Sequence, residues 1–385
     1  MCGIVAYTGM RPAARVLIDG SKRLEYRGYD SSGIAVCSGS DVQCVKSIGK
    51  VKALEDAVRN SVPELLDAAG YGIAHTRWAT HGEPSDINAH PHCDSKGEFY
   101  IVHNGIIDNY QALRKRLEEQ GCVFRSSTDS EVIAHLIAKL YQGDLVQAVA
   151  AAVRKLSGTY GIAVVSSRHP GMIAAARKGS PLVIGLGTNE NIAASDLAAI
   201  LPYTRQVMYL NDGDIAAITA DTVEVRNIEN VPLEREVTRI EWDADAVEKG
   251  SYPHFMLKEI FEQPETIENA IRGRLDHEMK SAILSGLNLT PRESAQISRI
   301  VIAGCGSSMH AGLVGEYFFE DIAGIPAEVE QAAEFRYRNP IIDPHTLVLP
   351  ISQSGETADT IAAVREATAK GAIVAALCNV VGSTV

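Results

Sequence analysis

The sequence predicts two kinds of fold in one chain: an α+β region with a large mixed sheet, followed by an α/β region with a doubly wound parallel sheet. Short β-branched runs between turn residues indicate the mixed sheet, and they occur at residues 71–74, 99–103, 161–165, 182–185 and 214–218. From Arg299 onward, strands and helices alternate, which is the pattern of a parallel sheet. The charged stretch that follows Pro232 has little apolar periodicity and is typical of a connector.

Helices in the first region are indicated by apolar residues at helical spacing. This spacing predicts helices over residues 12–24, 109–120, 129–142 and 145–156, the third of them preceded by a Ser-Thr-Asp capping signal. We place the first domain at residues 1–235, a linker at 236–252 and the second domain at 253–385.

The second region begins with a predicted amphipathic helix from His254. Its strands are expected at residues 299–303, 327–330, 346–351 and 372–378, and its helices at 309–323 and 358–370. A doubly wound sheet needs helices on both faces, and the sequence stops after a strand. We therefore expect this second domain to be truncated.

Composition excludes several classes of protein. The 385 residues are 46% hydrophobic and 22% charged, which is ordinary for a globular protein and long enough for two domains. With 36 Lys and Arg against 48 Asp and Glu, the net charge is -12, so the chain lacks the basic excess that a nucleic-acid partner would require. No apolar run approaches a membrane span, and no signal peptide precedes Cys2.

The seven cysteines are odd in number and have no CxxC pairing, which argues against a disulfide framework and a structural zinc site. Together with the lack of a membrane segment, this predicts a cytoplasmic protein.

Two polar loops follow strands in the second region, at residues 304–308 (GCGSS) and 352–357 (SQSGET). A dinucleotide fingerprint is excluded, because Met309 stands where the third glycine of GxGxxG belongs. Hydroxyls and amides at a helix N-terminus favour an anion, so a single phosphate held by both loops is our interpretation. The alternative is that these Ser and Thr residues only cap the helices.

Cys2 is followed by a small Gly, a context in which the initiator Met is usually removed. Cys2 would then carry both a thiol and a free α-amino group, whose unperturbed pKa of roughly 7.7 to 8.0 lets it accept the thiol proton. Such a residue suits attack on a carboxamide. Taken alone, Cys2 is better interpreted as a small hydrophobic residue.

Several motifs together resemble the glutamine–fructose-6-phosphate aminotransferase (isomerizing) family, also called glucosamine-6-phosphate synthases. In the first region these are residues 2–5 (CGIV), 24–33 (LEYRGYDSSG), 75–85 (HTRWATHGEPS), 88–92 (NAHPH) and 103–107 (HNGII). In the second they are residues 255–264 (FMLKEIFEQP), 304–308, 334–338 (EFRYR) and 352–357. The first set resembles the family's glutaminase domain and the second its sugar isomerase (SIS) domain.

The resemblance implies an N-terminal-nucleophile (Ntn) hydrolase fold for the first domain, an αββα sandwich. It implies that Cys2 is the nucleophile that attacks the side-chain amide of glutamine, with its own α-amine as the base. The side chain of Asn104 and the amide of Gly105 would bind the oxyanion, and Arg27 and Gly28 would lie beside the nucleophile. An Asn-Gly pair can also be a hairpin turn.

The resemblance also implies which residues bind glutamine. Arg77 would pair with the α-carboxylate and Asp129 with the α-ammonium, while Trp78, Thr80 and His81 would form a mobile wall over the substrate. Asp129 could instead be only the cap of the following helix.

His90 and His92 form a His-x-His pattern, but no Cys or carboxylate at a metal spacing completes a site. We expect no metal and no cofactor.

In the second domain the resemblance assigns the phosphate of fructose 6-phosphate to the side chains of Ser307, Ser308, Ser352, Gln353, Ser354 and Thr357. Members of the family pass ammonia from glutamine to this sugar and form glucosamine 6-phosphate, the first step of hexosamine synthesis. They extend beyond residue 385 and are expected to dimerise through the SIS domains. This chain is expected to hydrolyse glutamine but not to make the amino sugar by itself.

Two other functions remain open from the sequence. Other Ntn amidotransferases, such as amidophosphoribosyltransferase and asparagine synthetase, share the Cys-Gly-Ile and Asn-Gly motifs, but their synthase halves differ from residues 352–357. A SIS-type sensor of sugar phosphates is the second alternative, and it would not explain Cys2, Arg77 and Asn104.

Overall fold

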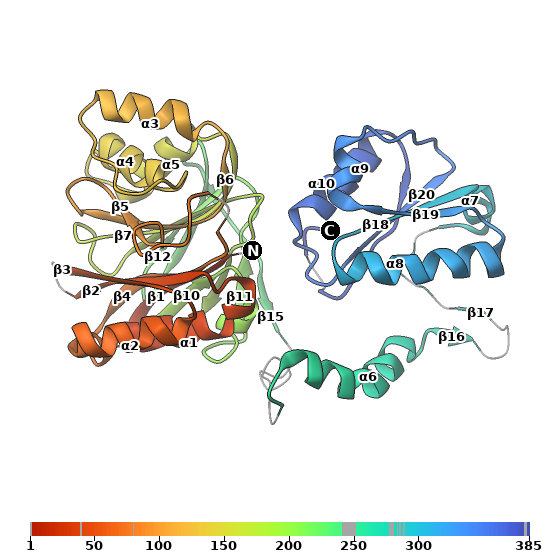
Figure 1. The fold of residues 1–385 in the computed structure, drawn as a ribbon, viewed down its shortest axis with the longest axis horizontal. Helices are drawn as coiled ribbons and strands as arrows, with labels where there is room; N and C mark the ends of the chain where they lie inside the picture. Colours follow the sequence, from red (N-terminus) through yellow and green to blue (C-terminus); the bar gives the residue numbers. More distant parts are fainter. Residues whose placement is uncertain are drawn as a thin grey trace. The chain divides into compact units, whose positions relative to one another are not determined.

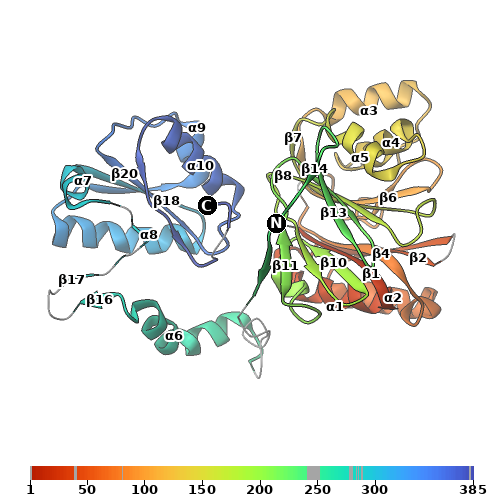
Figure 2. The same cartoon turned by 180° about the vertical axis from the view of Figure 1, so that it is seen from behind.

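The computed structural model describes residues 2–38, 41–79, 81–240, 252–276, 281–282, 284, 286–287, 289–380 and 383–385. The chain divides into two compact units, Met1–Glu248 and Lys249–Val385 (Figures 1 and 2). Each unit is described by itself. No helix among the described residues is both long and apolar enough to cross a membrane.

The first unit contains two antiparallel sheets. One has eight strands in the order β15-β11-β9-β10-β1-β4-β2-β3, and the other has seven in the order β14-β13-β12-β8-β7-β6-β5. The strands of the first are β1 (Gly3–Pro12), β2 (Ser31–Ser38), β3 (Asp41–Ile48), β4 (Ala69–Arg77), β9 (Val183–Leu186), β10 (Glu190–Ala194), β11 (Gln206–Tyr209) and β15 (Val237–Arg239). Those of the second are β5 (His92–Cys93), β6 (Phe99–Ile107), β7 (Gly158–Ser166), β8 (Ile173–Lys178), β12 (Asp214–Ile218), β13 (Val223–Asn227) and β14 (Pro232–Leu233).

Helices cover the outer face of each sheet. The eight-stranded sheet packs against α1 (Ala13–Arg23) and α2 (Val51–Ser61), and the seven-stranded sheet against α4 (Glu131–Leu140) and α5 (Leu145–Val153), beside which α3 (Tyr110–Glu119) lies (Figure 1). Short 3-10 turns occur at Glu25–Arg27, Pro63–Leu66 and Leu197–Ala199. The unit is therefore the αββα sandwich expected for an Ntn hydrolase.

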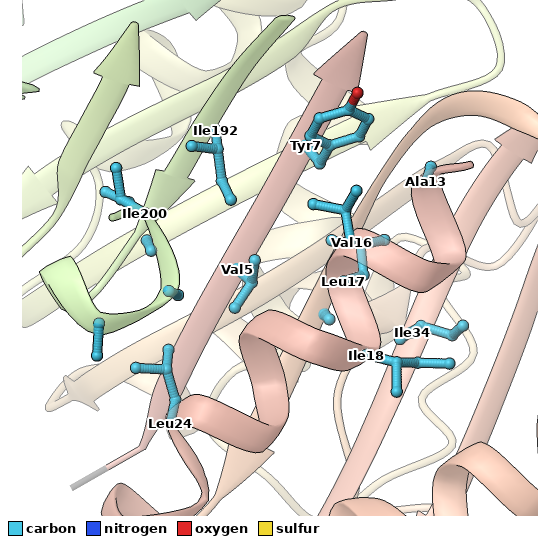
Figure 3. Close-up of a cluster of buried hydrophobic side chains, with 14 of the residues drawn as sticks. Val5, Tyr7, Ala13, Val16, Leu17, Ile18, Leu24, Ile34, Ile192 and Ile200 are labelled. Atoms are coloured by element: carbon cyan, nitrogen blue, oxygen red, sulfur yellow. The ribbon is translucent and has the colours of Figure 1, made fainter. Parts of the chain in front are cut away.

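Burial on both faces explains why the strands of this unit are apolar almost continuously. In β1, Val5 and Tyr7 belong to the core beneath α1 (Figure 3), whereas Ile4 and Ala6 belong to the core between the sheets. Successive side chains of a strand point to opposite faces, so both sets can be buried only if both faces are covered.

The four helices expected in this unit are confirmed, with ends that differ by at most three residues. Helix α2 was not expected from the sequence, although Val51, Leu54 and Val58 are buried at helical spacing. Strand β15 lies inside the segment expected to be a linker, because Val237–Arg239 pairs with β11. Residues 241–251 lie outside the described part of the chain, so the proposed domain limits remain a prediction.

The second unit is built on a parallel sheet, in which β19 (Ala327–Gln331), β18 (Arg299–Gly304), β20 (Thr346–Ser352) and β21 (Ile373–Val374) are neighbours. Helix α8 (Ser307–Phe318), continued by a π-helical turn to Ala323, packs on one face; α9 (Ala332–Tyr337) and α10 (Ala358–Ala369) pack on the other. This arrangement confirms the predicted doubly wound sheet.

One expected strand, over residues 372–378, is divided into β21 and β22 (Leu377–Cys378), which pair with β20 in the same register. Pro350 of β20 stands opposite the interruption and has no N–H to donate.

The remaining elements of this unit are short except for α6 (Phe255–Ile271), which confirms the helix expected from His254. They are β16 (Leu275–Asp276), β17 (Ser281–Ala282) and α7 (Pro291–Gln296), which begins with a capping box formed by Thr290 and Glu293.

We predict that Ile73→Ala lowers the free energy of unfolding of the first unit by about 2–5 kcal/mol, because Ile73 is 0% exposed between the two sheets. Urea denaturation measures this change. Ile87→Ala is the matched control, since Ile87 is 61% exposed and its truncation should change stability by less than about 0.5 kcal/mol. Equal effects of the two substitutions would contradict the assignment of this core.

Candidate active site

Cys2 lies directly before β1, beside the end of β4. Strands β1 and β4 pair in a register that sets Gly3 opposite Thr76. Cys2, one residue earlier, therefore lies near Trp78. The Trp78 N–H donates to the Cys2 Sγ at 3.2 Å, and the Sγ lies 3.4 Å from the Trp78 carbonyl oxygen. Gly28 lies against the same backbone, where an added Cβ would come within 2.7 Å of the Arg77 carbonyl carbon.

The surroundings of Cys2 shift the pKa of its thiol in opposite directions. Burial raises the pKa of the thiol, while the Trp78 N–H and the cations Arg77 and Arg27 oppose this effect without cancelling it. A thiol with a raised pKa is protonated near neutral pH and is a poor nucleophile, so any attack by Cys2 requires a base.

Asn104 and Gly105 lie within β6 and not in a hairpin turn, which excludes that alternative. The Asn104 Nδ2 donates to the Cys2 carbonyl oxygen at 3.0 Å. Gly105 has a φ of +128°, and a Cβ there would come within 2.1 Å of the Thr159 carbonyl oxygen. Only glycine fits this position, and the pairing of β6 with β7 holds its backbone in place.

Arg77 ends β4, and its guanidinium group is held by backbone carbonyl groups. Its Nη2 donates to the carbonyl oxygens of His81 and, at 2.9 Å, Gly82; its Nη1 donates to that of Glu83 at 3.5 Å. Burial lowers the pKa of Arg77, and the negative charges of Asp30 and Asp129 counteract this effect. Arg77 thus lies within electrostatic range of Cys2 and of two carboxylates.

Asp129 is buried and does not cap the helix that follows it. Its Oδ2 accepts from the Ile107 N–H at 2.8 Å, and its Oδ1 from the Ser130 hydroxyl at 3.3 Å. Helix α4 begins at Glu131 with Ser130 as its N-cap. The carboxylate is therefore fixed beside β6 at Ile107, and the capping alternative is wrong.

Among the other expected glutamine-site residues, Trp78 and His81 each contact an aromatic ring. Trp78 is 45% exposed and meets Tyr29 edge to face at 5.6 Å between centroids, and His81 meets Tyr110 at 5.5 Å. Arg27 is buried, and its Nη1 lies 2.7 Å from the Asp196 Oδ2. Thr80 lies outside the described residues.

Three residues that support this region received no role from the sequence. The Asp30 Oδ2 accepts from the Ala79 N–H at 2.8 Å. The Asn88 Nδ2 donates to the Glu83 carbonyl oxygen at 2.9 Å, and its Oδ1 accepts from the Ser127 N–H at 3.0 Å. Asp30 and Asn88 lie inside the motifs identified from the sequence. Asp196 lies 169 positions from Arg27 in the sequence, so no local motif indicates that the two side chains pair.

Four buried histidines, His75, His90, His92 and His103, lie behind Asn104. The rings of His75 and His90 stack at 4.1 Å, and those of His90 and His92 meet at 4.5 Å. Burial lowers the pKa of all four, that of His75 to about 3. Among the residues that the structure describes, no group of three or more His, Cys, Asp or Glu side chains could hold a metal ion.

In the second unit, the two polar loops follow neighbouring parallel strands. Because β18 and β20 pair with Gly304 opposite Ile351, both loops leave the same edge of the sheet. Ser307 is exposed and Ser308 half-buried at the start of α8; Ser352 is buried, Gln353 exposed, and Ser354 and Thr357 half-buried. The structure thus brings the six expected phosphate-binding residues to one edge.

Hydrogen bonds within the second loop orient its hydroxyl groups. The Ser352 Oγ accepts from the Gly355 N–H at 3.0 Å, and the Ser354 Oγ from the Glu356 N–H at 3.2 Å. A hydroxyl that accepts from an amide keeps its own proton to donate. Neither α8, whose N-cap is Gly306, nor α10, whose N-cap is Thr357, has a side-chain cap bond, so capping alone does not account for these residues.

Two family models match the chain: the glutamine amidotransferase domain over residues 75–202, and the SIS domain over residues 295–385. The chain therefore combines a glutamine amidotransferase domain with a SIS domain.

Whole-chain relatives extend this classification. The chain is 51% identical over its whole length to a glutamine–fructose-6-phosphate aminotransferase (isomerizing) of Symbiobacterium thermophilum, and 52% identical to that of Chlorobaculum tepidum. It resembles the glutaminase domain and the first part of the SIS domain of this aminotransferase, and it spans 63% of the length of both relatives.

Among solved structures, one titled as the allosteric regulatory enzyme of purine biosynthesis has a similar fold. The TM-score is 0.50 at 20% sequence identity, and the match covers 98% of this chain and 80% of that one.

We predict that the first unit loses stability as the pH falls from about 6.5 toward 3. His75 has a pKa of about 3 when folded and roughly 6.5 when unfolded, so the unfolded chain binds more protons in this window. For each pH unit below about 6.5, this histidine then lowers the free energy of unfolding by about 1.4 kcal/mol. Urea denaturation at pH 7.5, 6 and 5 measures the loss.

The contribution of His75 is isolated by comparing His75→Gln with His310→Gln, which replaces an exposed histidine of α8. His75→Gln should show a shallower dependence of stability on pH, and His310→Gln the same dependence as the unsubstituted chain. An unchanged slope for His75→Gln would show that His75 does not stay neutral in the fold.

Proposed function

We propose that this chain is the glutamine-hydrolysing part, with part of the sugar-phosphate-binding domain, of an amidotransferase that converts fructose 6-phosphate and glutamine to glucosamine 6-phosphate and glutamate. The observation that carries the proposal is the contact between Cys2 and Asn104. The backbone carbonyl oxygen of Cys2 accepts from the Asn104 Nδ2 at 3.0 Å. Further support is that both Cys2 and the Asp129 carboxylate lie within electrostatic range of Arg77.

The chemistry begins with removal of Met1, which exposes the α-amine of Cys2. The amine takes the thiol proton, and the sulfur attacks the side-chain amide carbon of glutamine. The tetrahedral intermediate collapses as the amine returns the proton to the leaving nitrogen, which departs as ammonia. Water then hydrolyses the γ-glutamyl thioester to glutamate and regenerates the thiol. The raised pKa of Cys2 supports the need for this base.

The negative charge formed during attack requires donors that are already in place. Asn104 Nδ2 and the Gly105 N–H are proposed for this role. Both belong to β6. The pairing of β6 with β7 holds the Gly105 backbone in place, at a positive φ that only glycine adopts easily. Donors on a rigid strand do not have to reorganise as the charge develops.

The two charged ends of glutamine are proposed to bind Arg77 and Asp129. The three carbonyl bonds of Arg77 use three of the five N–H groups of a guanidinium, and the group is held in one orientation by them. Asp129 is fixed by the Ile107 N–H. Trp78, Thr80 and His81 are proposed to cover the substrate, with Arg27 and Gly28 beside the nucleophile.

The phosphate of fructose 6-phosphate is proposed to bind the loops that begin with Ser307 and Ser352. Support comes from their common position at the carboxyl edge of the parallel sheet and from the two helix N-termini there, which favour an anion. Ser308, Gln353, Ser354 and Thr357 complete the proposed site.

Amino-sugar synthesis is proposed for the longer protein that the relatives represent, because this chain spans 63% of their length. In that protein, ammonia would pass from Cys2 to the sugar carbonyl through a passage closed to water, and two copies would associate through their SIS domains. We further propose that it acts in the cytoplasm and requires neither nucleic acid, membrane, metal nor cofactor.

We predict that the chain releases glutamate from glutamine and that Cys2→Ala lowers this rate more than 100-fold, because the thioester cannot form. Intact mass first establishes that Met1 is absent, and coupled oxidation of glutamate measures the rate. Cys93→Ala is the control, since this half-buried thiol lies on β5 away from the proposed chemistry. Undiminished activity in Cys2→Ala would reject the catalytic proposal, and inactivity of the processed, folded chain would remove its support.

We predict that Ser307→Ala and Ser354→Ala weaken binding of fructose 6-phosphate about tenfold each, because each removes a hydrogen bond to a charged group. Calorimetric titration of the chain measures this. Ser294→Ala on α7 is the control and should bind normally. Equal binding of fructose without its phosphate would show that these loops do not hold an anion.

A further inference from the structure

His75 is a buried residue of β4 whose side chain contacts the proposed oxyanion donor. Its Nε2 lies 3.0 Å from the Asn104 Oδ1 and 3.1 Å from the His103 carbonyl oxygen. Both partners can only accept hydrogen bonds. The proton of a neutral imidazole must therefore lie on Nε2, and His75 donates toward Asn104.

This bond decides which end of the Asn104 amide faces Cys2. With Oδ1 toward His75, Nδ2 points to the Cys2 carbonyl oxygen at 3.0 Å. Rotating the amide by half a turn would place its oxygen against the Cys2 carbonyl oxygen and its NH2 against the His75 N–H. Two acceptors and two donors would then face each other, so both partners select the same orientation.

The surroundings keep the imidazole in position. His75 is 0% exposed, and β4 is hydrogen-bonded to β1 on one side and β2 on the other. Its ring is stacked on His90 with an interplanar angle of 17°. Among the described residues its Nδ1 has no hydrogen-bond partner, although it is buried. An apolar side chain would fill this space without that cost, so packing alone does not account for a histidine here.

We propose that His75 is a positioning residue of the glutaminase reaction, which holds the Asn104 carboxamide with its NH2 directed to the oxyanion. The inference rests on the proposed function of Cys2 and Asn104. Without the His75 donor, only the Cys2 carbonyl oxygen selects the orientation of the amide, so the rotated form, whose oxygen would face the developing negative charge, becomes more populated.

The consequence is a loss in turnover with little effect on substrate binding. Removing an oxyanion donor outright typically costs about 100- to 1,000-fold in kcat, so partial misorientation should cost less. We predict that His75→Leu lowers kcat for glutamine hydrolysis about 10- to 100-fold and leaves KM within about twofold, because the ammonium and carboxylate sites are not altered.

The test is a double-substitution cycle, with kcat and KM measured for His75→Leu, Asn104→Ala and the chain that carries both. If His75 acts through Asn104, His75→Leu should have less than about a threefold effect on kcat once the amide is gone. A full 10- to 100-fold effect in the Asn104→Ala background would overturn the proposal, as would a normal kcat for His75→Leu.

His75→Gln provides a second test, because its side-chain NH2 can still donate to Asn104. It should retain more activity than His75→Leu, and its remaining defect should also vanish in the Asn104→Ala background. This variant decides the question if His75→Leu does not fold. His92→Leu is the control: it alters the same histidine cluster without a bond to Asn104, and its kcat should stay within about threefold of normal.

Failure of this inference is distinct from failure of the proposed function. Undiminished hydrolysis by Cys2→Ala would remove the function itself. Loss of hydrolysis in Cys2→Ala, combined with independent effects of His75 and Asn104, would keep the function and reject only the positioning role.

Discussion

The antiparallel pairing of β1 with β4 is the constraint on which the candidate active site depends. It places Gly3 opposite Thr76, and so brings Cys2 to the backbone of Trp78, directly after Arg77 at the end of β4. The register cannot slip by one residue, because β1 is buried on both faces and a slip would exchange the two sets of core side chains. The hydrophobic core thereby sets the position of the thiol.

Behind the thiol, the fold stabilises a group of polar side chains that burial would otherwise penalise. His75, His90 and His103 stay neutral and are tied to backbone groups and to Asn104. Neutral rings avoid the cost of burying charge, while their hydrogen bonds give a defined direction to the amide in front of them. Such a network holds Asn104 in one orientation, which suits the oxyanion role proposed for it.

The second unit brings the residues proposed to bind a phosphate together by a different route. In a parallel sheet, the loops that follow adjacent strands leave at one edge, so residues 304–308 and 352–357 meet there. The Oγ atoms of Ser352 and Ser354 then accept from amides of their own loop, which leaves each hydroxyl its own proton to donate. Here backbone topology brings the residues together, and local hydrogen bonds orient them.

The sequence by itself determined most helices, several strands and the two kinds of sheet, because these follow from periodicity. Its short motifs, through the family resemblance, also indicated Cys2, Arg77, Asn104 and Asp129 as candidates. It did not reveal that β15 continues the first sheet, that carbonyl groups of residues 81–83 hold Arg77, or that Asp196 pairs with Arg27. The bond between His75 and Asn104 joins residues 29 positions apart. Such contacts depend on strand register and on how far each side chain is buried, and only the tertiary structure decides these.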